Sequence, residues 1–258
     1  MLRKMLMVLL LLPQVAWSAL VEERVKHTLD GTVFESVLVY DDAVNIPRPA
    51  VLMVPNWLGV TPQAVEQAKL VATQDYVVLV ADVYGENVRP KTPAEAQQVA
   101  TLLRNNRPLL RARANHALDT LLSAGQKVGL HPQQTAAIGF CFGGGTVLEM
   151  ARSGRPLKGV VSFHGNLDTP NPADAAQIKA AVLVLHGADD PYVPPAQVAA
   201  FEAEMKAQSQ VDWQLLSFGG AVHSFTDPDA NSPGRAMYHE RTAKRAYAAM
   251  NKFFAEIF

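Results

Sequence analysis

The single cysteine of the chain, Cys141, lies at the centre of a Gly-Phe-Cys-Phe-Gly motif at residues 139–143. An apolar run at residues 135–138 precedes the motif, and two further glycines follow it before a helix-forming segment begins. This pattern predicts a strand, a sharp turn and a helix, with the cysteine raised above the sheet at the turn. The positive N-terminus of that helix favours a thiolate. A lone cysteine is usually an inert small hydrophobe, so it is the surrounding motif that predicts a nucleophile.

A carboxylate that could assist this nucleophile follows a later apolar segment, residues 181–185, which is typical of a strand buried on both faces. Two neighbours, Asp189 and Asp190, come soon after that segment. A carboxylate in this place can orient a histidine and stabilise its charged form. The local pattern does not choose between the two aspartates, and either could instead initiate the turn before Pro191.

A general base is predicted at His223, in a loop of small residues that follows the expected strand at residues 213–218. A neutral imidazole there could accept the thiol proton, and an imidazolium could pair with the thiolate. The alternative is an ordinary histidine in a surface loop. His164 and His186 both follow expected strands and precede glycine, so we expect them to be structural residues that hydrogen-bond the backbone near the same rim.

The three motifs together resemble the dienelactone hydrolase family: Cys141 in its turn, Asp190 before Pro-Tyr-Val-Pro, and His223 before Ser-Phe. The resemblance covers about residues 25–257 and includes Asp-Val-Tyr-Gly at 82–85 and Val-Val-Ser-Phe-His-Gly at 160–165. It selects Asp190 as the acid, because the pattern of these enzymes places the acid directly before x-x-Val-Pro. It implies an α/β-hydrolase fold and hydrolysis of an ester or lactone through a thioester acyl-enzyme.

The chain also departs from the family that it resembles. Asn56 stands where the well-studied members carry a glutamate that helps to activate the cysteine. Those members also place two arginines that hold a substrate carboxylate, and the matching positions here are Glu86 and Asp227. Arg89 is close to the first position and is a possible substitute. The resemblance therefore implies the same core chemistry, and we expect a neutral ester or lactone as substrate in place of an anionic dienelactone.

An oxyanion hole is expected from the backbone N–H groups of Phe142, next to the cysteine, and of Trp57, in the loop after the strand at residues 50–54. No spacing of metal ligands and no dinucleotide-binding motif is visible, so we expect neither a metal nor a cofactor. Five side chains are candidates to line the substrate pocket: Asn56, Tyr84, Glu86, Tyr192 and Phe225.

The elements that would position these residues alternate between strand and helix. An Asp-Gly turn at residues 30–31 predicts an antiparallel hairpin of residues 22–28 and 32–40. Thr61-Pro62 and Thr92-Pro93 are typical helix starts, and Pro108 is expected to divide residues 94–124 into two helices. The last helix is expected over residues 234–258. This alternation predicts a mostly parallel central sheet with helices on both faces and a site beyond the carboxyl ends of its strands. The remaining strands are expected at 50–54, 76–81, 135–140, 157–163, 181–185 and 213–218.

Composition favours one catalytic domain over residues 19–258. The chain has 258 residues, of which 49% are hydrophobic, and this length is ordinary for a single α/β domain. Residues 1–18 combine Arg3 and Lys4, an apolar run and small residues before Ala19, which is typical of a cleavable signal peptide. That apolar run is too short to span a membrane. We therefore expect an exported, periplasmic protein.

The expected partner is a small-molecule ester or lactone. The formal net charge of −1 gives no basic surface for nucleic acid, and no membrane association is expected after cleavage of the signal peptide. The sequence does not determine the oligomeric state. Two other functions are compatible with the motifs: a non-catalytic exported binding protein on the same scaffold, and a hydrolase of thioesters or peptides.

Overall fold

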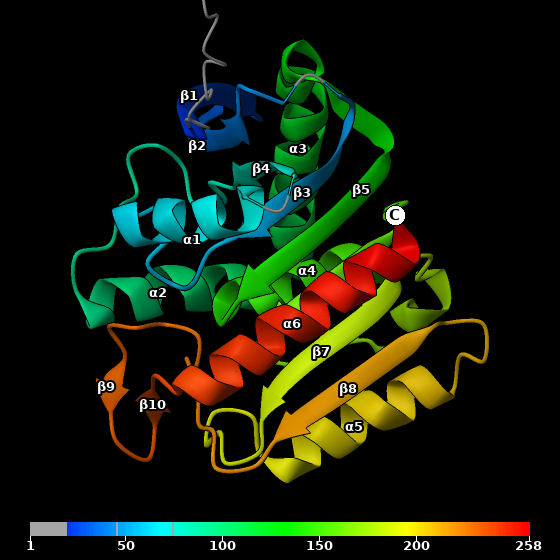
Figure 1. The fold of residues 1–258 in the computed structure, drawn as a ribbon. Coiled ribbons are helices and arrows are strands. Elements are labelled where there is room, and N and C mark those ends of the chain that lie inside the picture. Colours follow the sequence, from blue (N-terminus) through cyan, green and yellow to red (C-terminus); the bar gives the residue numbers. More distant parts are fainter. Residues whose placement is uncertain (1–19, 45, 74) are drawn as a thin grey trace, which may run out of the picture.

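The computed structural model describes residues 20–44, 46–73 and 75–258, so the expected signal peptide lies outside the described residues. One eight-stranded sheet runs through the molecule in the order β1-β2-β4-β3-β5-β6-β7-β8 (Figure 1). A separate pair, β9 and β10, lies apart from it. The strands are β1 (Leu20–Leu29), β2 (Thr32–Asp41), β3 (Arg48–Val54), β4 (Val77–Val80), β5 (Leu130–Phe140), β6 (Gly159–Phe163), β7 (Ala181–Gly187), β8 (Trp213–Phe218), β9 (Asn231–Ser232) and β10 (Ala236–Met237).

The sheet is parallel from β4 through β3 to β8, whereas β1 and β2 pair antiparallel with each other, and β2 pairs antiparallel with β4. Asp30 (φ 49°) and Gly31 (φ 75°) form the turn between β1 and β2. Two successive positive φ angles are the geometry that an Asp-Gly hairpin turn requires. The expected architecture, a mostly parallel α/β-hydrolase sheet with an N-terminal antiparallel hairpin, is confirmed.

Helices cover both faces of the sheet, because alternate residues of each parallel strand are buried on opposite sides. α1 (Pro62–Ala72) and α6 (Glu240–Ile257) pack on the face that carries Val51 and Met53. The other face, which carries Leu52 and Val54, is covered by α2 (Pro93–Arg104), α3 (Arg107–Gly125), α4 (Phe142–Arg152) and α5 (Pro195–Lys206). Two short 3-10 helices, η1 (Gln126–Val128) and η2 (Pro172–Gln177), complete the set.

The predicted helix starts are confirmed. Thr61 caps α1 by accepting a hydrogen bond from Ala64 N–H, and Thr92 caps α2 by accepting one from Glu95 N–H. The long segment divides as expected: α2 ends at Arg104, and α3 begins at Arg107 with Pro108 in its first turn.

The start of the last helix differs from the expectation. α6 begins at Glu240, and residues 231–237 form β9, a turn with Gly234 at φ 73°, and β10. This segment is held extended because it pairs with the His223 backbone: His223 N–H donates to Arg235 O, and Met237 N–H donates to His223 O. The helix therefore starts six residues later than predicted at residue 234, after a ribbon that supports the His223 loop.

Buried ion pairs hold α4, the helix that follows Cys141. The Arg152 guanidinium lies 2.8 Å from Glu204 and 3.0 Å from Glu149. Arg111 reaches Glu149 from α3 at 2.8 Å. Arg152, Glu149 and Glu204 are all nearly inaccessible to solvent. Because buried charges are stable only when paired, this network joins α3 and α5 to the last turn of α4.

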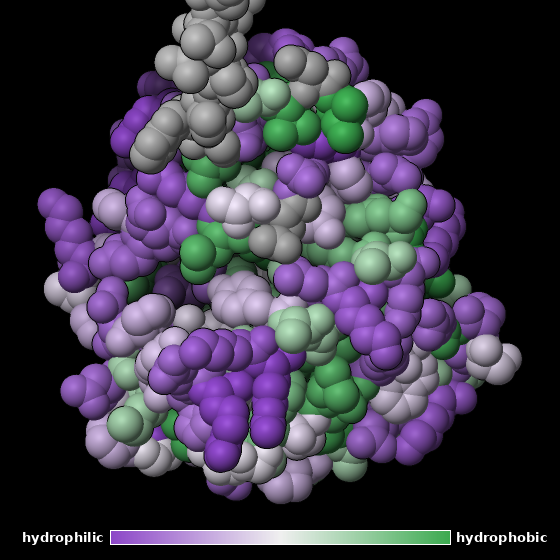
Figure 2. Space-filling view, in the orientation of Figure 1, coloured by the Kyte–Doolittle hydropathy of each residue, from purple (hydrophilic) through white to green (hydrophobic). Residues whose placement is uncertain are grey.

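The surface over α1 and α6 is mainly hydrophilic, with apolar residues gathered in small, separate patches (Figure 2). Within the described part of the chain, no helix is both long enough and apolar enough to span a membrane.

Candidate active site

Cys141 occupies a strained turn between β5 and α4, as predicted. Its φ of 54° and ψ of −115° lie outside the ordinary regions for a residue with a side chain. The flanking glycines are required by close approach of the backbone. A Cβ on Gly139 would lie 2.1 Å from Gly143 O, and a Cβ on Gly143 would lie 2.0 Å from Val54 O. The turn therefore raises Cys141 at the carboxyl edge of the sheet.

His223 and Asp190 meet beyond the ends of β7 and β8. His223 Nδ1 lies 2.7 Å from Asp190 Oδ2, and both residues are buried. The other oxygen of Asp190 accepts the Tyr192 N–H at 2.9 Å, which fixes the carboxylate. Asp189, by contrast, is exposed. Asp190 is thus the aspartate that lies beside the histidine.

The side chains of Cys141 and His223 shift each other's ionisation. Burial alone would raise the pKa of the Cys141 thiol, but His223, Arg104 and the Phe142 N–H outweigh it, and the pKa is lowered. Burial alone would lower the pKa of His223, but the Cys141 thiolate and the bond to Asp190 raise it to about 10. These opposite shifts favour a thiolate paired with an imidazolium over a thiol paired with a neutral imidazole.

His164 contacts the backbone of Cys141. The Cys141 backbone N–H donates to His164 Nδ1 at 3.2 Å, so the proton of the neutral ring lies on Nε2, which is 2.8 Å from Thr226 Oγ1. Burial, and next the charge of His223, holds the pKa of His164 well below its usual value. His164 does hydrogen-bond the backbone, as predicted, but it also packs edge-on against His223, with 5.3 Å between the ring centroids.

The two expected oxyanion donors lie on loops at this edge. The Phe142 N–H acts on the Cys141 thiol and lowers its pKa. Trp57 lies in the loop after β3, where its carbonyl accepts the Tyr84 hydroxyl at 3.0 Å. Among residues 20–44, 46–73 and 75–258, nothing accepts a hydrogen bond from the Trp57 N–H. Both N–H groups are thus compatible with oxyanion binding.

Two of the candidate pocket residues lie at the site. Tyr192 packs edge-on against His223, with 5.1 Å between the ring centroids, and is about half exposed. Tyr84 packs against Phe142 at 5.5 Å and is buried. Asn56 lies in the same loop as Trp57, and its side chain accepts the Leu58 N–H at 3.0 Å. Asn56 therefore shapes this loop.

Phe225 and Glu86 are placed differently from the expectation. Phe225 has no solvent exposure and packs against Phe218 and His164, so it belongs to the core under the site. The carboxylate of Glu86 lies 2.6 Å from Lys26 Nζ on β1. An ion pair with the N-terminal hairpin draws Glu86 away from a role beside Cys141.

Three other charged residues, Arg89, Asp227 and Arg104, bear on the charge of the substrate. Arg89 pairs with the buried Asp82 at 2.9 Å and is not free to hold a substrate carboxylate. Asp227 is partly buried, and burial raises the pKa of its carboxyl group. Arg104, at the end of α2, is a cation that sequence reasoning missed: its Cζ lies 5.8 Å from the ring centroid of Phe142. No local sequence motif marks Arg104, because only the packing of α2 brings it to the turn at Cys141.

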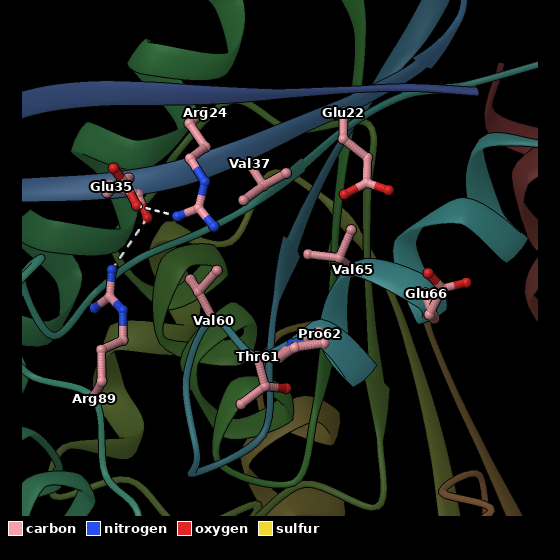
Figure 3. A pocket seen from close by; sticks show the side chains of 10 residues that line it. All are labelled: Glu22, Arg24, Glu35, Val37, Val60, Thr61, Pro62, Val65, Glu66 and Arg89. Atoms are coloured by element: carbon pink, nitrogen blue, oxygen red, sulfur yellow. Dashed lines mark hydrogen bonds and ion pairs between the residues drawn. The ribbon is translucent and has the colours of Figure 1, made fainter. Parts of the chain in front are cut away.

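A cavity of about 270 Å³ lies away from these groups, between the β1–β2 hairpin and the start of α1 (Figure 3). Arg24 and Arg89 point toward Glu35 in it, and Lys69 pairs with Glu22 and Glu66 at its rim. Its charges already have partners, so nothing in it calls for a ligand. Within the described residues, no cluster of three or more histidine, cysteine or acidic side chains could hold a metal.

Comparison with known proteins agrees with the geometry. The model of the dienelactone hydrolase family matches residues 34–258. A dienelactone hydrolase-like promiscuous phosphotriesterase from metagenomic libraries is 37% identical, with a TM-score of 0.87 over 93% of this chain and 99% of its own. A dienelactone hydrolase from Anabaena variabilis is 21% identical with a TM-score of 0.68 over 93% and 99%, a likeness of fold.

Curated relatives match shorter segments. An uncharacterised protein of Caenorhabditis elegans is 33% identical over 156 residues, which are 58% of this chain and 94% of the worm protein. A carboxymethylenebutenolidase homologue of Mus musculus is 25% identical over 125 residues, which are 48% of this chain and 50% of the mouse protein. The chain thus aligns with half of the mouse protein.

Proposed function

Because the chain belongs to the dienelactone hydrolase family and is a hydrolase that acts on esters, we propose that it cleaves esters or lactones through a thioester on Cys141. One observation supports this most directly. Cys141 lies at a strained turn, and the pKa of its thiol is lowered by His223, whose Nδ1 lies 2.7 Å from Asp190. A nucleophile, a base and an orienting carboxylate in this arrangement suit acyl transfer.

In the first half of the reaction, the Cys141 thiolate attacks the carbonyl carbon, and the carbonyl oxygen becomes an oxyanion. The N–H groups of Phe142 and Trp57 stabilise that oxyanion; loss of one such donor typically costs about 3 kcal/mol. His223 then donates its Nε2 proton to the leaving alkoxide as the C–O bond breaks. The product is a thioester between the acyl group and Cys141.

In the second half, His223 is neutral and accepts a proton from water. The resulting hydroxide attacks the thioester carbon, and the Cys141 thiolate leaves as the acid is released. Asp190 keeps the proton on Nδ1 throughout, so that Nε2 faces the reacting atoms. Cys141, His223, Asp190 and the N–H groups of Phe142 and Trp57 thus perform both halves of the reaction.

We propose a neutral substrate. Neither position at which the family carries a carboxylate-binding arginine is cationic here, and Arg89 is committed to Asp82. Asp227 stays four residues after His223, although Glu86 is turned toward Lys26. The charge argument for a neutral ester therefore rests on Asp227 and on the absence, at these two positions, of an arginine that could bind a substrate carboxylate.

Export is part of the proposal. The basic start, the apolar run and the small residues before Ala19 support cleavage after residue 18 and a periplasmic enzyme. Mass spectrometry of the protein purified from an expressing Gram-negative cell would give the mature N-terminus. An N-terminus at Ala19 in the periplasmic fraction would support export, and an intact Met1 in the cytoplasm would contradict it.

A second substrate class is favoured by one relative. The promiscuous phosphotriesterase is 37% identical over nearly the whole chain. A thiolate beside two N–H donors could also attack a neutral phosphotriester and stabilise the developing phosphoryl oxyanion. We therefore include phosphotriesters among the substrates to be tested.

The test is turnover by the purified chain and by Cys141→Ala. The panel holds neutral aryl esters, lactones, thioesters, a short peptide and a dialkyl aryl phosphate. We expect turnover of esters or lactones by the natural chain and its near loss in the variant. Turnover of only the thioester or peptide would change the substrate class. Full ester turnover by Cys141→Ala would contradict the proposed mechanism.

A further inference from the structure

We propose that Arg104 holds Cys141 in its anionic form in the resting enzyme, and so supplies the activation that the family obtains from the glutamate replaced here by Asn56. Arg104 is a positioning residue in this account, because it acts on the nucleophile and does not touch the substrate. The inference rests on the proposed role of Cys141.

The geometry begins at the end of α2. Arg104 is the last residue of that helix, and its guanidinium carbon lies 5.8 Å from the ring centroid of Phe142. Phe142 directly follows Cys141, and its N–H lowers the pKa of the Cys141 thiol. The ring of Tyr84 packs against the same phenyl ring. The cation is therefore placed against the residue that directly follows Cys141.

Among the described residues Arg104 has no ion-pair partner, unlike Arg107 and Arg111, which follow it on α3. Arg107 pairs with Asp168 at 2.7 Å, Arg111 pairs with Glu149 and Asp174, and Arg113 donates to the carbonyls of Val83 and Tyr84. In the described part of the chain, no carboxylate lies within ion-pair distance of Arg104, and its buried Nε has no hydrogen-bond partner. A partly buried cation without a carboxylate is stabilised by another nearby anion. Cys141 is the acidic group next to Phe142, and the Arg104 charge lowers the pKa of its thiol.

The charges that face Cys141 come from several elements. His223 approaches from the loop after β8, with Asp190 behind it, and Arg104 approaches from α2. The Tyr84 phenol is neutral, because burial raises its pKa, and His164 is kept neutral beneath the backbone. Two cations thus act on one sulfur, and Asn56 adds no opposing charge.

This arrangement differs in its timing from activation by a carboxylate. A carboxylate near the sulfur would repel a thiolate in the resting enzyme, so the proton would have to leave during the reaction. With Asn56 and Arg104, the thiolate is present before the substrate binds. The thiol should therefore react with small alkylating agents at mildly acidic pH and without substrate.

The experiment is the pH dependence of alkylation of Cys141 by iodoacetamide, together with the ultraviolet absorbance of the thiolate. Arg104→Gln and Arg104→Met remove the charge, and Arg104→Lys retains it. Arg241→Gln, on the exposed side of α6, is the matched control for loss of one positive charge. Thermal unfolding is measured for each variant.

We expect both neutral variants to shift the midpoint of alkylation to higher pH and to slow alkylation at mildly acidic pH by roughly three- to thirtyfold. Arg104→Lys should keep most of the reactivity, and Arg241→Gln should match the natural chain. Two neutral variants are included so that a fold defect in one leaves the test decisive. If Arg104→Gln and Arg104→Met fold and show the same pH profile of alkylation as the natural chain, the proposal for Arg104 is overturned, and the proposed function is not affected. Failure of the proposed function would appear separately, as full ester turnover by Cys141→Ala.

Discussion

The 2.7 Å bond between His223 Nδ1 and Asp190 Oδ2 joins two loops that leave neighbouring parallel strands, β7 and β8. The carboxylate accepts the Nδ1 proton, so Nε2 is the ring nitrogen that is left to face Cys141. The second oxygen of Asp190 accepts the Tyr192 N–H. Hydrogen bonds therefore connect the Tyr192 backbone, the Asp190 carboxylate and the His223 ring in series.

Replacement of Asp190 by Asn should reduce kcat by about a thousandfold or more, because an amide stabilises the wrong imidazole tautomer. Asp189→Asn is the matched control, since Asp189 is adjacent in sequence but exposed. Its kcat on a neutral aryl ester should stay near that of the natural chain. A large loss in Asp189→Asn with a mild effect in Asp190→Asn would show that the other aspartate orients His223.

Substrate charge should matter in the direction set by the missing arginines. Matched pairs of esters that differ only in a distal carboxylate should show a higher kcat/KM for the neutral member. Even a residual 1.4 kcal/mol of repulsion is about a tenfold preference. The measurement is made at low and moderate salt. A preference for the ester that carries the carboxylate, if it disappears in Arg104→Gln, would assign Arg104 to substrate binding. That result would contradict both the neutral substrate and the proposed action of Arg104 on Cys141.

The buried ion pairs under α4 predict a stability effect. Arg152→Met leaves Glu204 buried without a cation and leaves Glu149 with Arg111 alone, and should lower the free energy of unfolding by about 3–5 kcal/mol. Arg155→Met is the control, because its ion pair with Asp119 is largely exposed and should contribute about 1 kcal/mol or less. Urea denaturation measures both. Equal losses in the two variants would contradict a special role for the buried network.

Acid should weaken the attachment of the N-terminal hairpin through His27 on β1. Burial, and next the charge of His116, lowers the pKa of His27 to about 4, while an unfolded histidine has a pKa of about 6.5. A folded state that resists protonation is fully stabilised above the unfolded pKa, and this contribution is lost as pH falls from about 6.5 toward 4. His27→Gln should therefore lose less Tm between pH 7 and pH 4.5 than the natural chain does. An identical loss of Tm would exclude His27 as a source of acid sensitivity.

The sequence by itself determined the order and local form of the site elements. Residues 139–143 specify the turn at Cys141, because only glycine tolerates the close backbone approaches on either side of it. Asp-Gly at residues 30–31 specifies the hairpin in the same local way. Asp190 and His223 could be expected beside Cys141, because the carboxyl ends of parallel strands meet at one edge of the sheet.

Tertiary structure decided which partner each long side chain found. Glu86 pairs with Lys26, sixty residues away in the chain. Arg104 reaches Phe142 because α2 packs beside the turn at Cys141. The start of α6 was likewise set by pairing of residues 235–237 with the His223 backbone. Periodicity and turn residues encode the local backbone, which depends on neighbours in sequence. The partner of a flexible charged side chain depends on which elements pack together, and no local pattern records that choice.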